Sequence, residues 1–442
     1  MLKFRKAANE TSSVVSKTRS QDVPGLTGLR FVAALSVLLG HSLTLLFNSH
    51  QTPEGIITWL ERATGFGMTL FFVLSGFVIH YNYAAAVTGT RAAPAIGAFL
   101  WARFARLYPL FLLVLFIGVL KDSKPFHMLA GEFKPFHEVI EALPYFLLSI
   151  QSWLYIPIGN AALIYAAGGF ASLSWSISTE WFFYLVFPGI AWLVTKPRSA
   201  RLIVVLALVW CVVWMCISIS LYDRAPQIDA WAVARFGPVA GMHDNLQDSF
   251  VRWLLYFSPY LRIGEFILGT LMAQLYRQLR DRKVTAAENA FGTAMFFTAA
   301  ASVFLINYLE YSPDVGMNIF RETNMNFALA PSAAVLLLCA ARYRNPAVAV
   351  LNSGIAIMLG DASYSIYLLH FGILTAIAGV PALSGHGILF DTCKLVIALA
   401  LIIVISIMVY RYYEAPARRW LRQFWVERPA LAVPMSAQNS SL

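Results

Sequence analysis

Charged side chains are scarce in this sequence. Asp, Glu, Lys and Arg make up 13% of its 442 residues, whereas 59% are hydrophobic and the mean hydropathy is +0.64. Because soluble globular proteins carry about 25% charged residues, an ordinary soluble protein is excluded. The net charge of +10 comes from basic residues at the ends of apolar runs, whereas nucleic-acid binding needs a basic patch on a soluble surface. We expect no nucleic-acid partner, and the basic residues favour membrane lipids or an anionic cytosolic ligand.

Cysteine is also scarce. Four cysteines lie in apolar segments and form no CxxC pair: Cys211, Cys216, Cys339 and Cys393. Cysteine in such surroundings is more often a small core residue than a disulfide partner or a metal ligand, so we expect no metal site. We detect no internal repeat and expect no appended soluble domain. We also expect no cleavable signal peptide, because residues 1–24 are polar and basic and the first apolar run is long enough to remain as an anchor.

Long apolar runs recur along the whole chain. A membrane-spanning helix needs about 20 mostly apolar residues. Ten runs approach or reach this length: 27–48, 66–83, 105–120, 172–194, 202–221, 253–276, 289–308, 326–341, 354–378 and 391–411. Pro144, Gln151 and Pro157 interrupt a further stretch, 139–157, which favours an interfacial or re-entrant segment there. We predict an all-α polytopic membrane protein with about ten transmembrane helices.

Lysine and arginine are distributed unevenly between the segments that connect these runs. If the N-terminus is cytoplasmic, the inner segments carry 22 of them and the outer segments carry 8. This asymmetry predicts that both termini are cytoplasmic. We therefore predict a cytoplasmic N-terminal segment (1–24), one membrane domain (25–421) and a disordered cytoplasmic tail (422–442).

Two ionisable residues of the first run share one helical face. Arg30 and His41 are eleven positions apart, which returns a helix to within roughly 20° and places them about 16 Å apart along its axis. Ionisable groups inside a membrane need a partner or water, so this pair indicates a site. Lys394 lies near the end of its run and is expected to reach the interface. For Arg262 and Glu265, three positions apart, a structural ion pair is at least as good an interpretation as a functional one.

Three ionisable positions from different runs fall at one depth. With the N-terminus inside, His41, Glu180 and His370 each lie about 10–12 Å below the outer surface. Two histidines and a carboxylate at one level have the composition of a general acid–base centre.

Arginine gathers instead near the inner surface. Arg30, Arg103 and Arg106 lie there, and together they favour binding of the phosphates of a cytosolic ligand. The alternative for Arg103 and Arg106 is that they only follow the bias for positive charge inside.

Six segments, in order and spacing, resemble the membrane acyltransferase-3 family. They cover the chain from about residue 25 to 421: LTGLRFVAALSVLLGHS (26–42), FFVLSGFVI (71–79), RFARLYPL (103–110), SLSWSISTEWFFYLVFP (172–188), GDASYSIYLLH (360–370) and YEAPARRW (413–420). The resemblance implies a multi-pass protein of the bacterial inner membrane. Members typically move an acyl group, most often acetyl, from cytosolic acyl-CoA to a hydroxyl of a carbohydrate at or beyond the membrane, such as an exopolysaccharide or a lipopolysaccharide.

The resemblance also implies which residues act. The family's motifs fall on Arg30 with His41, on Arg103 with Arg106, on Glu180, and on a later group formed by Tyr364, Tyr367 and His370. Phe31, Trp181 and Phe182 depart from the usual residues and are expected to affect the acceptor side. Some relatives carry a C-terminal SGNH hydrolase-like domain; none is expected here, so the membrane domain completes the transfer alone or passes the acyl group to another protein.

Our mechanistic hypothesis assigns a role to each residue. His41 is the general base for the acceptor hydroxyl, and Glu180 orients it or stabilises its protonated form. His370 or Tyr367 donates to the developing oxyanion. Arg30, Arg103 and Arg106 hold the phosphates of acyl-CoA.

Several alternatives remain open from the sequence. An acyl-histidine intermediate is a variant of this mechanism. A transporter or flippase of a lipid-linked sugar also places ionisable groups in the membrane, although the paired halves typical of transporters are not seen. Acylation of a small molecule or lipid is a third reading. The acceptor, the acyl group and the oligomeric state are not predicted.

Overall fold

The computed structural model describes residues 23–46, 64–122, 136–167, 173–197, 199–242, 248–311, 327–380, 383 and 387–426. Most of the predicted N-terminal segment (1–24) and most of the predicted tail (422–442) lie outside these residues. The last described helix continues to Val426, so the first five residues of the predicted disordered tail are helical.

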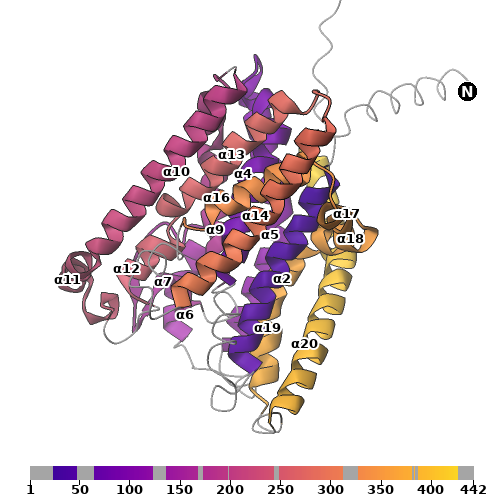
Figure 1. Cartoon of the computed structure of the whole chain (residues 1–442). Helices are drawn as coiled ribbons and strands as arrows, with labels where there is room; N and C mark the ends of the chain where they lie inside the picture. Colours follow the sequence, from indigo (N-terminus) through magenta and orange to yellow (C-terminus); the bar gives the residue numbers. More distant parts are fainter. Residues whose placement is uncertain are drawn as a thin grey trace, which may run out of the picture.

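The described part of the chain is almost entirely helical, with long helices packed side by side (Figure 1). The longer helices are α2 (Pro24–Leu46), α4 (Thr64–Val87), α5 (Ala92–Asp122), α9 (Trp175–Val194), α10 (Ala200–Asp223), α13 (Pro259–Leu279), α14 (Ala286–Tyr311), α16 (Ala330–Arg342), α19 (Ser363–Ala378) and α20 (Ile388–Val409). The shorter elements are α6 (Phe136–Leu147), β1 (Pro157–Ile158), β2 (Ala161–Ala162), α7 (Leu163–Ala166), α11 (Ala225–Phe236), η3 (Pro238–Ala240), α12 (Phe250–Arg252), η4 (Trp253–Phe257), α17 (Pro346–Leu351), α18 (Gly354–Asp361), η6 (Tyr410–Glu414) and α21 (Ala415–Val426).

Seven helices of the described residues are long and apolar enough to cross a membrane. They are α2, α4, α5, α9, α10, α14 and the continuous helix formed by α20, η6 and α21. An eighth is obtained if α18 and α19, which meet at 64°, form one broken span. The prediction of an all-α multi-pass membrane protein is thus supported, whereas the count of ten is not confirmed. The side on which each terminus lies stays a prediction.

The predicted runs that do not pass this test are explained by their sequences. The run 253–276 corresponds mainly to α13, which has 21 residues but carries Arg262, Glu265 and Gln274 within them. The run 326–341 corresponds to α16, which has only 13 residues. The third span also begins earlier than predicted: α5 starts at Ala92, whereas the predicted run is 105–120.

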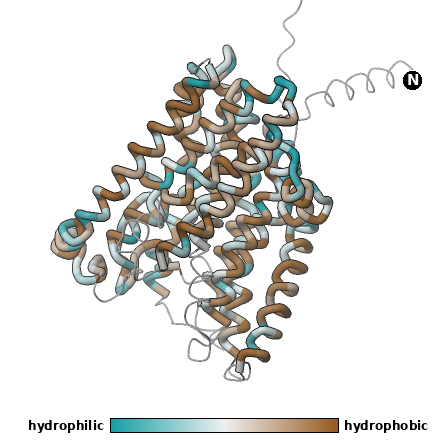
Figure 2. The backbone as a smooth tube through the Cα atoms, viewed as in Figure 1, coloured by the Kyte–Doolittle hydropathy of each residue, from teal (hydrophilic) through white to brown (hydrophobic). Residues whose placement is uncertain are grey.

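Apolar side chains face outward on the peripheral helices. Figure 2 shows α10 and α20 as hydrophobic along most of their length. Only 17% of an apolar stretch of 18 residues is buried in α10, and the same share in the continuous helix that begins with α20. Exposed examples are Leu208 and Val212 on α10 and Val396 and Ile397 on α20. Continuous apolar surface of this extent is unfavourable in water and is the surface that lipid chains solvate.

Residues 139–157 are covered by short elements. Helix α6 has twelve residues and includes Pro144. A turn follows in which Ser149 has φ 56°, and the two-residue strands β1 and β2 then pair antiparallel. A twelve-residue helix is too short to span a bilayer, in agreement with the interfacial or re-entrant segment predicted there.

Two ion pairs of the apolar helices join residues three positions apart. Arg262 lies 2.9 Å from Glu265 on α13, and both side chains are buried. Thr69 of α4 donates a hydrogen bond of 2.7 Å to Oε1 of the same carboxylate. The structural pair expected for these two residues is therefore present. Lys394 lies 2.8 Å from Asp391 and also donates to the carbonyl of Leu383.

Helices α4 and α13 pack at the centre through glycines. A β-carbon on Gly76 would overlap the carbonyl oxygen of Phe266, and one on Gly269 would overlap that of Val73. Small residues allow such close approach of backbones in membrane proteins, where packing replaces the hydrophobic effect between helices. This close packing of α4 on α13 holds Met68, Phe72 and Ser75 of α4 in place, and these three residues line the cavities described below.

Gly269→Ala should destabilise the protein. The added methyl forces α4 and α13 apart, and overpacking of this kind costs about 1–3 kcal/mol. The melting temperature of the purified protein in detergent measures the effect. Gly189→Ala on α9 is the control, because its β-carbon would meet no atom within 4 Å. Equal melting temperatures for the two variants would contradict the packing argument.

Candidate functional site

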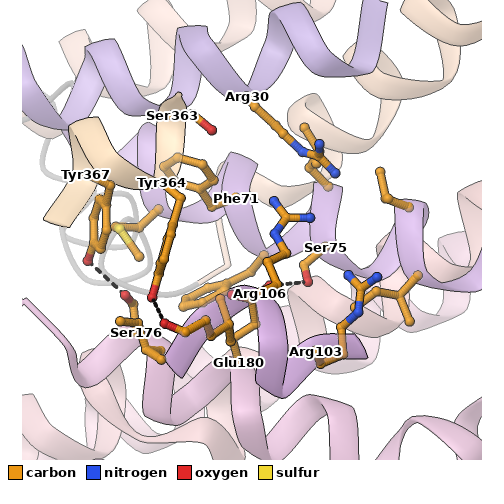
Figure 3. Close-up of a pocket in the computed structure, with 17 residues that line it drawn as sticks. Arg30, Phe71, Ser75, Arg103, Arg106, Ser176, Glu180, Ser363, Tyr364 and Tyr367 are labelled. Carbon is orange, nitrogen blue, oxygen red and sulfur yellow. Dashed lines mark hydrogen bonds between the residues drawn. The ribbon is translucent and has the colours of Figure 1, made fainter. Parts of the chain in front are cut away.

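Three arginines line one cavity between α2, α4, α5, α9 and α19. This space, the arginine cavity, has a volume of about 70 Å³ and is lined by Arg30, Arg103 and Arg106 together with Ser75 and Glu180. Figure 3 shows the three guanidinium groups around it, with Arg30 contributed by α2 and the other two by α5. Helical spacing of three residues places Arg103 and Arg106 on one face of α5.

None of these three arginines forms an ion pair with a carboxylate of the described residues. Arg103 is buried, donates a hydrogen bond of 2.8 Å to the hydroxyl of Tyr83, and lies 4.9 Å from the centre of that ring. Its Nε has no hydrogen-bond partner in the described part of the chain. Gathering several cations in an apolar interior is costly unless an anion compensates them. The cavity therefore suits a ligand with several negative charges.

Glu180 is the single acidic residue among those that line the arginine cavity. Its Oε1 accepts a hydrogen bond of 2.7 Å from Ser75 on α4. One carboxylate against three guanidinium groups leaves the lining positive, so Glu180 reduces their mutual repulsion without neutralising them.

Two histidines from different helices are hydrogen-bonded to each other. Nδ1 of His41 on α2 lies 2.9 Å from Nε2 of His370 on α19, and the two rings are nearly parallel, with an interplanar angle of 10°. His370 is fully buried. Its Nδ1 lies 3.1 Å from the backbone carbonyl of Ile366.

These contacts assign the proton positions in the pair. A carbonyl oxygen only accepts, so Nδ1 of His370 carries the hydrogen that it donates to Ile366. In a neutral ring Nε2 is then the acceptor, and Nδ1 of His41 is the donor. The remaining nitrogen of His41, Nε2, is left unprotonated and able to accept a proton.

His41 lines a second cavity, whose volume is about 370 Å³. We call it the outer chamber, after the side of the membrane on which the predicted topology places it. Aromatic side chains dominate its lining, and Arg252 is the one arginine or lysine among the lining residues. The lining residues are Val37, His41, Thr44, Leu45, Met68, Tyr165, Leu173, Trp175, Arg252, Tyr256, Phe257, Tyr367 and Phe371.

The arginine cavity and the outer chamber have two wall residues in common, Met68 of α4 and Tyr367 of α19. The Tyr367 hydroxyl donates to the carbonyl of Leu173 at 3.0 Å. It accepts from Ser176 at 2.9 Å (Figure 3). These bonds fix Tyr367, so the flexible Met68 is the side chain that can move. We call the two residues the partition.

The structure groups the predicted residues differently from the expectation for Glu180. His41, Glu180 and His370 were expected side by side at one depth. His41 is bonded to His370, whereas Glu180 is bonded to Ser75 and lines the arginine cavity. Glu180 is therefore not placed to orient His41: it lines the same cavity as Arg30, which lies eleven residues before His41 on α2 and so about 16 Å from it along the helix axis.

The two residues that were expected to donate to the oxyanion already donate their hydrogens to backbone carbonyls in the structure. The hydrogen of His370 Nδ1 goes to Ile366, and that of the Tyr367 hydroxyl goes to Leu173. Tyr364 donates to the carbonyl of Leu107 at 2.7 Å.

Some lining residues were not singled out by the sequence. Arg252 was counted only as one of the basic residues of an outer segment, and no motif marks it. The departures Phe31, Trp181 and Phe182 line neither cavity.

Comparisons with known proteins agree with the sequence resemblance. Residues 23–411 match the family described as "Acyltransferase domain". The chain is 29% identical to "Acyltransferase MdmB" of Streptomyces mycarofaciens over 80% of its own length and 79% of that protein. It is 21% identical to "Putative O-acetyltransferase SACOL0978" of Staphylococcus aureus (strain COL) over 93% of its length, and spans 60% of that longer protein. No solved structure matches significantly. Within the described residues, no group of three His, Cys, Asp or Glu is placed to hold a metal ion.

Proposed function

This chain belongs to the acyltransferase family matched over residues 23–411 and is a membrane O-acyltransferase, and we propose its donor, its acceptor and its mechanism from this premise. The donor is acyl-CoA, with acetyl as the acyl group, on the cytosolic side of a bacterial inner membrane. The acceptor is a hydroxyl of a carbohydrate at the outer side. One observation carries the proposal: a cationic cavity and a histidine-bearing chamber share the wall formed by Met68 and Tyr367.

The arginine cavity is the proposed donor site. Coenzyme A carries a diphosphate and a ribose 3′-phosphate in its nucleotide half, and guanidinium groups bind phosphate through charge-assisted, bidentate hydrogen bonds. Arg30, Arg103 and Arg106 are not committed to carboxylates of the described residues, so their donors are available to such a ligand. The pantetheine arm then reaches past the partition and brings the thioester to His41.

His41 is the proposed general base. Its Nε2 takes the proton of the acceptor hydroxyl, whose oxygen forms the new ester bond with the acyl carbon. The bond from carbon to sulfur breaks, and the proton passes to the sulfur, so that the products are the O-acyl ester and free CoA thiol. His370 is a positioning residue in this scheme, because its hydrogen bond fixes the tautomer of His41 in the way a carboxylate does in a catalytic triad.

A bulky residue in the partition should block transfer. Met68→Trp places a rigid indole between the cavities, so we expect acyl transfer to fall at least about 100-fold, as misplacement of reacting groups does. Proteoliposomes with labelled acyl-CoA on one side and an acceptor glycan on the other measure the reaction.

Two observations separate blockage from misfolding. Met68→Leu conserves volume and should retain most activity. Met68→Trp should still bind acyl-CoA in equilibrium dialysis, because the three arginines are intact. Wild-type transfer rates in Met68→Trp would refute the route between the cavities. Absence of acyl-CoA-dependent product from the wild-type protein with every acceptor would refute the proposed reaction itself.

A further inference from the structure

Arg252 brings a positive charge into the aromatic outer chamber. It belongs to α12, where its backbone amide donates to Oγ of Ser249 at 3.2 Å. Its guanidinium carbon lies 5.6 Å from the centre of the Tyr256 ring and 5.7 Å from that of Phe257. Two aromatic rings on one arginine hold its plane in a fixed direction.

No carboxylate of the described residues neutralises Arg252. No Asp or Glu lines the outer chamber, and Arg252 forms no ion pair within the described ranges. The nearby acid Asp248 accepts the backbone amide of Ala162 at 2.7 Å instead. The Nε of Arg252 is buried and has no hydrogen-bond partner in the described structure. An uncompensated positive charge inside a protein is unfavourable, so an anion held by the guanidinium group in the chamber would be favourable.

The rest of the chamber suits a small ring-shaped ligand. Its volume of about 370 Å³ lies in the roughly 300–1,000 Å³ range of small-molecule sites. Aromatic side chains line it, among them those of Trp175, Tyr165 and Phe371. His41 lies in the same lining as Arg252, so one ligand can meet both a base and a cation.

We propose that the acceptor is an anionic sugar, whose carboxylate or phosphate is held by Arg252 while its hydroxyl faces Nε2 of His41. This inference rests on the proposed function for the assignment of the chamber to the acceptor. It narrows the substrate class from carbohydrates in general to those that carry a negative charge near the acylated hydroxyl. Arg252 is then a specificity-determining residue.

Three matched acceptors test this inference in proteoliposomes supplied with acyl-CoA. They share one aglycone and are a neutral hexoside, the corresponding hexuronide and the corresponding hexoside phosphate. We expect wild-type kcat/KM to be at least tenfold higher for one of the two anionic acceptors than for the neutral one, and the preferred one identifies the anion. In Arg252→Gln, kcat/KM for that acceptor should fall 10- to 100-fold, while the neutral acceptor changes less than threefold.

Arg235→Gln is the matched control, because Arg235 lies in the same outer segment and lines neither cavity. Arg235→Gln should leave kcat/KM for the anionic acceptor and for the neutral acceptor within threefold of the wild-type values. Equal use of anionic and neutral acceptors by the wild-type protein, or an equal loss for both in Arg252→Gln, would overturn the inference.

Equilibrium dialysis of the three glycosides against the full-length protein gives a second readout that needs no chemistry. Arg252→Gln should weaken binding of the anionic glycoside at least tenfold and leave the neutral one unchanged. If no acceptor is acylated, the proposed function fails, and the dialysis still decides the inference: equal binding of charged and neutral glycosides contradicts it.

Discussion

Replacing His41 by alanine should lower the rate of acyl transfer by roughly 10²–10⁴-fold, the contribution of a positioned general base. A sugar hydroxyl is a weak nucleophile at neutral pH, and Nε2 of His41 is the basic nitrogen that the hydrogen bonds of the pair leave free. The KM for acyl-CoA should change little, because the arginine cavity is intact. Labelled product formed in proteoliposomes from acyl-CoA and acceptor gives both constants.

A histidine outside the site provides the control for this result. His137 is exposed on α6, and His137→Ala should transfer at the wild-type rate. His370→Ala should give a smaller loss in kcat than His41→Ala, since His370 only positions the base. Wild-type rates in His41→Ala would show that the base is assigned to the wrong residue.

Replacing both Arg103 and Arg106 by methionine should cause the second large loss. Hydrogen bonds to charged groups contribute about 1.5–3 kcal/mol each, so kcat/KM for acyl-CoA should fall by at least about 100-fold. Methionine preserves much of the apolar stem that arginine packs. Initial rates over a range of donor concentrations measure the effect.

A truncated donor isolates the phosphate contribution. S-acetylpantetheine has the thioester and the arm but no phosphates, so the double variant should use it as well as the wild-type protein does. Arg91→Met is the control for loss of positive charge, because Arg91 is exposed and lines neither cavity. An equal loss with both donors would remove the phosphate role from these arginines.

The sequence was informative wherever one helix determined the result. The spacing of Arg30 and His41 predicted that both face the interior, and each lines a cavity. Each of the ten apolar runs overlaps a helix. The pair of Arg262 and Glu265 followed from a separation of three residues alone. Periodicity and local spacing suffice for such features.

Features that depend on how helices pack against each other were not predictable. Depth counted from the ends of the apolar runs suggested that Glu180 meets His41, but Glu180 is bonded to Ser75 in the cavity that Arg30 lines, and His370 is bonded to His41. Arg252 escaped attention because the three-residue helix α12 has no sequence pattern of its own, and only tertiary packing brings Arg252 to the chamber. The run 253–276 was predicted as a span, but the corresponding helix α13 carries a polar face that packs on α4 and is not among the seven helices apolar enough to cross a membrane.

The partition of Met68 and Tyr367 also has an electrical consequence for the proposed reaction. Wherever water enters cavities from both sides, the membrane voltage falls mainly across the apolar layer that separates them. The acyl group moves outward and the proton of the acceptor hydroxyl takes its place on the sulfur, so acyl-CoA and free CoA carry the same charge, as do the acceptor and its ester. One elementary charge moving through 100 mV is worth about 2.3 kcal/mol. Because no net charge crosses the layer in the complete reaction, none of this energy is gained or lost, and the equilibrium of acylation would be independent of the membrane voltage.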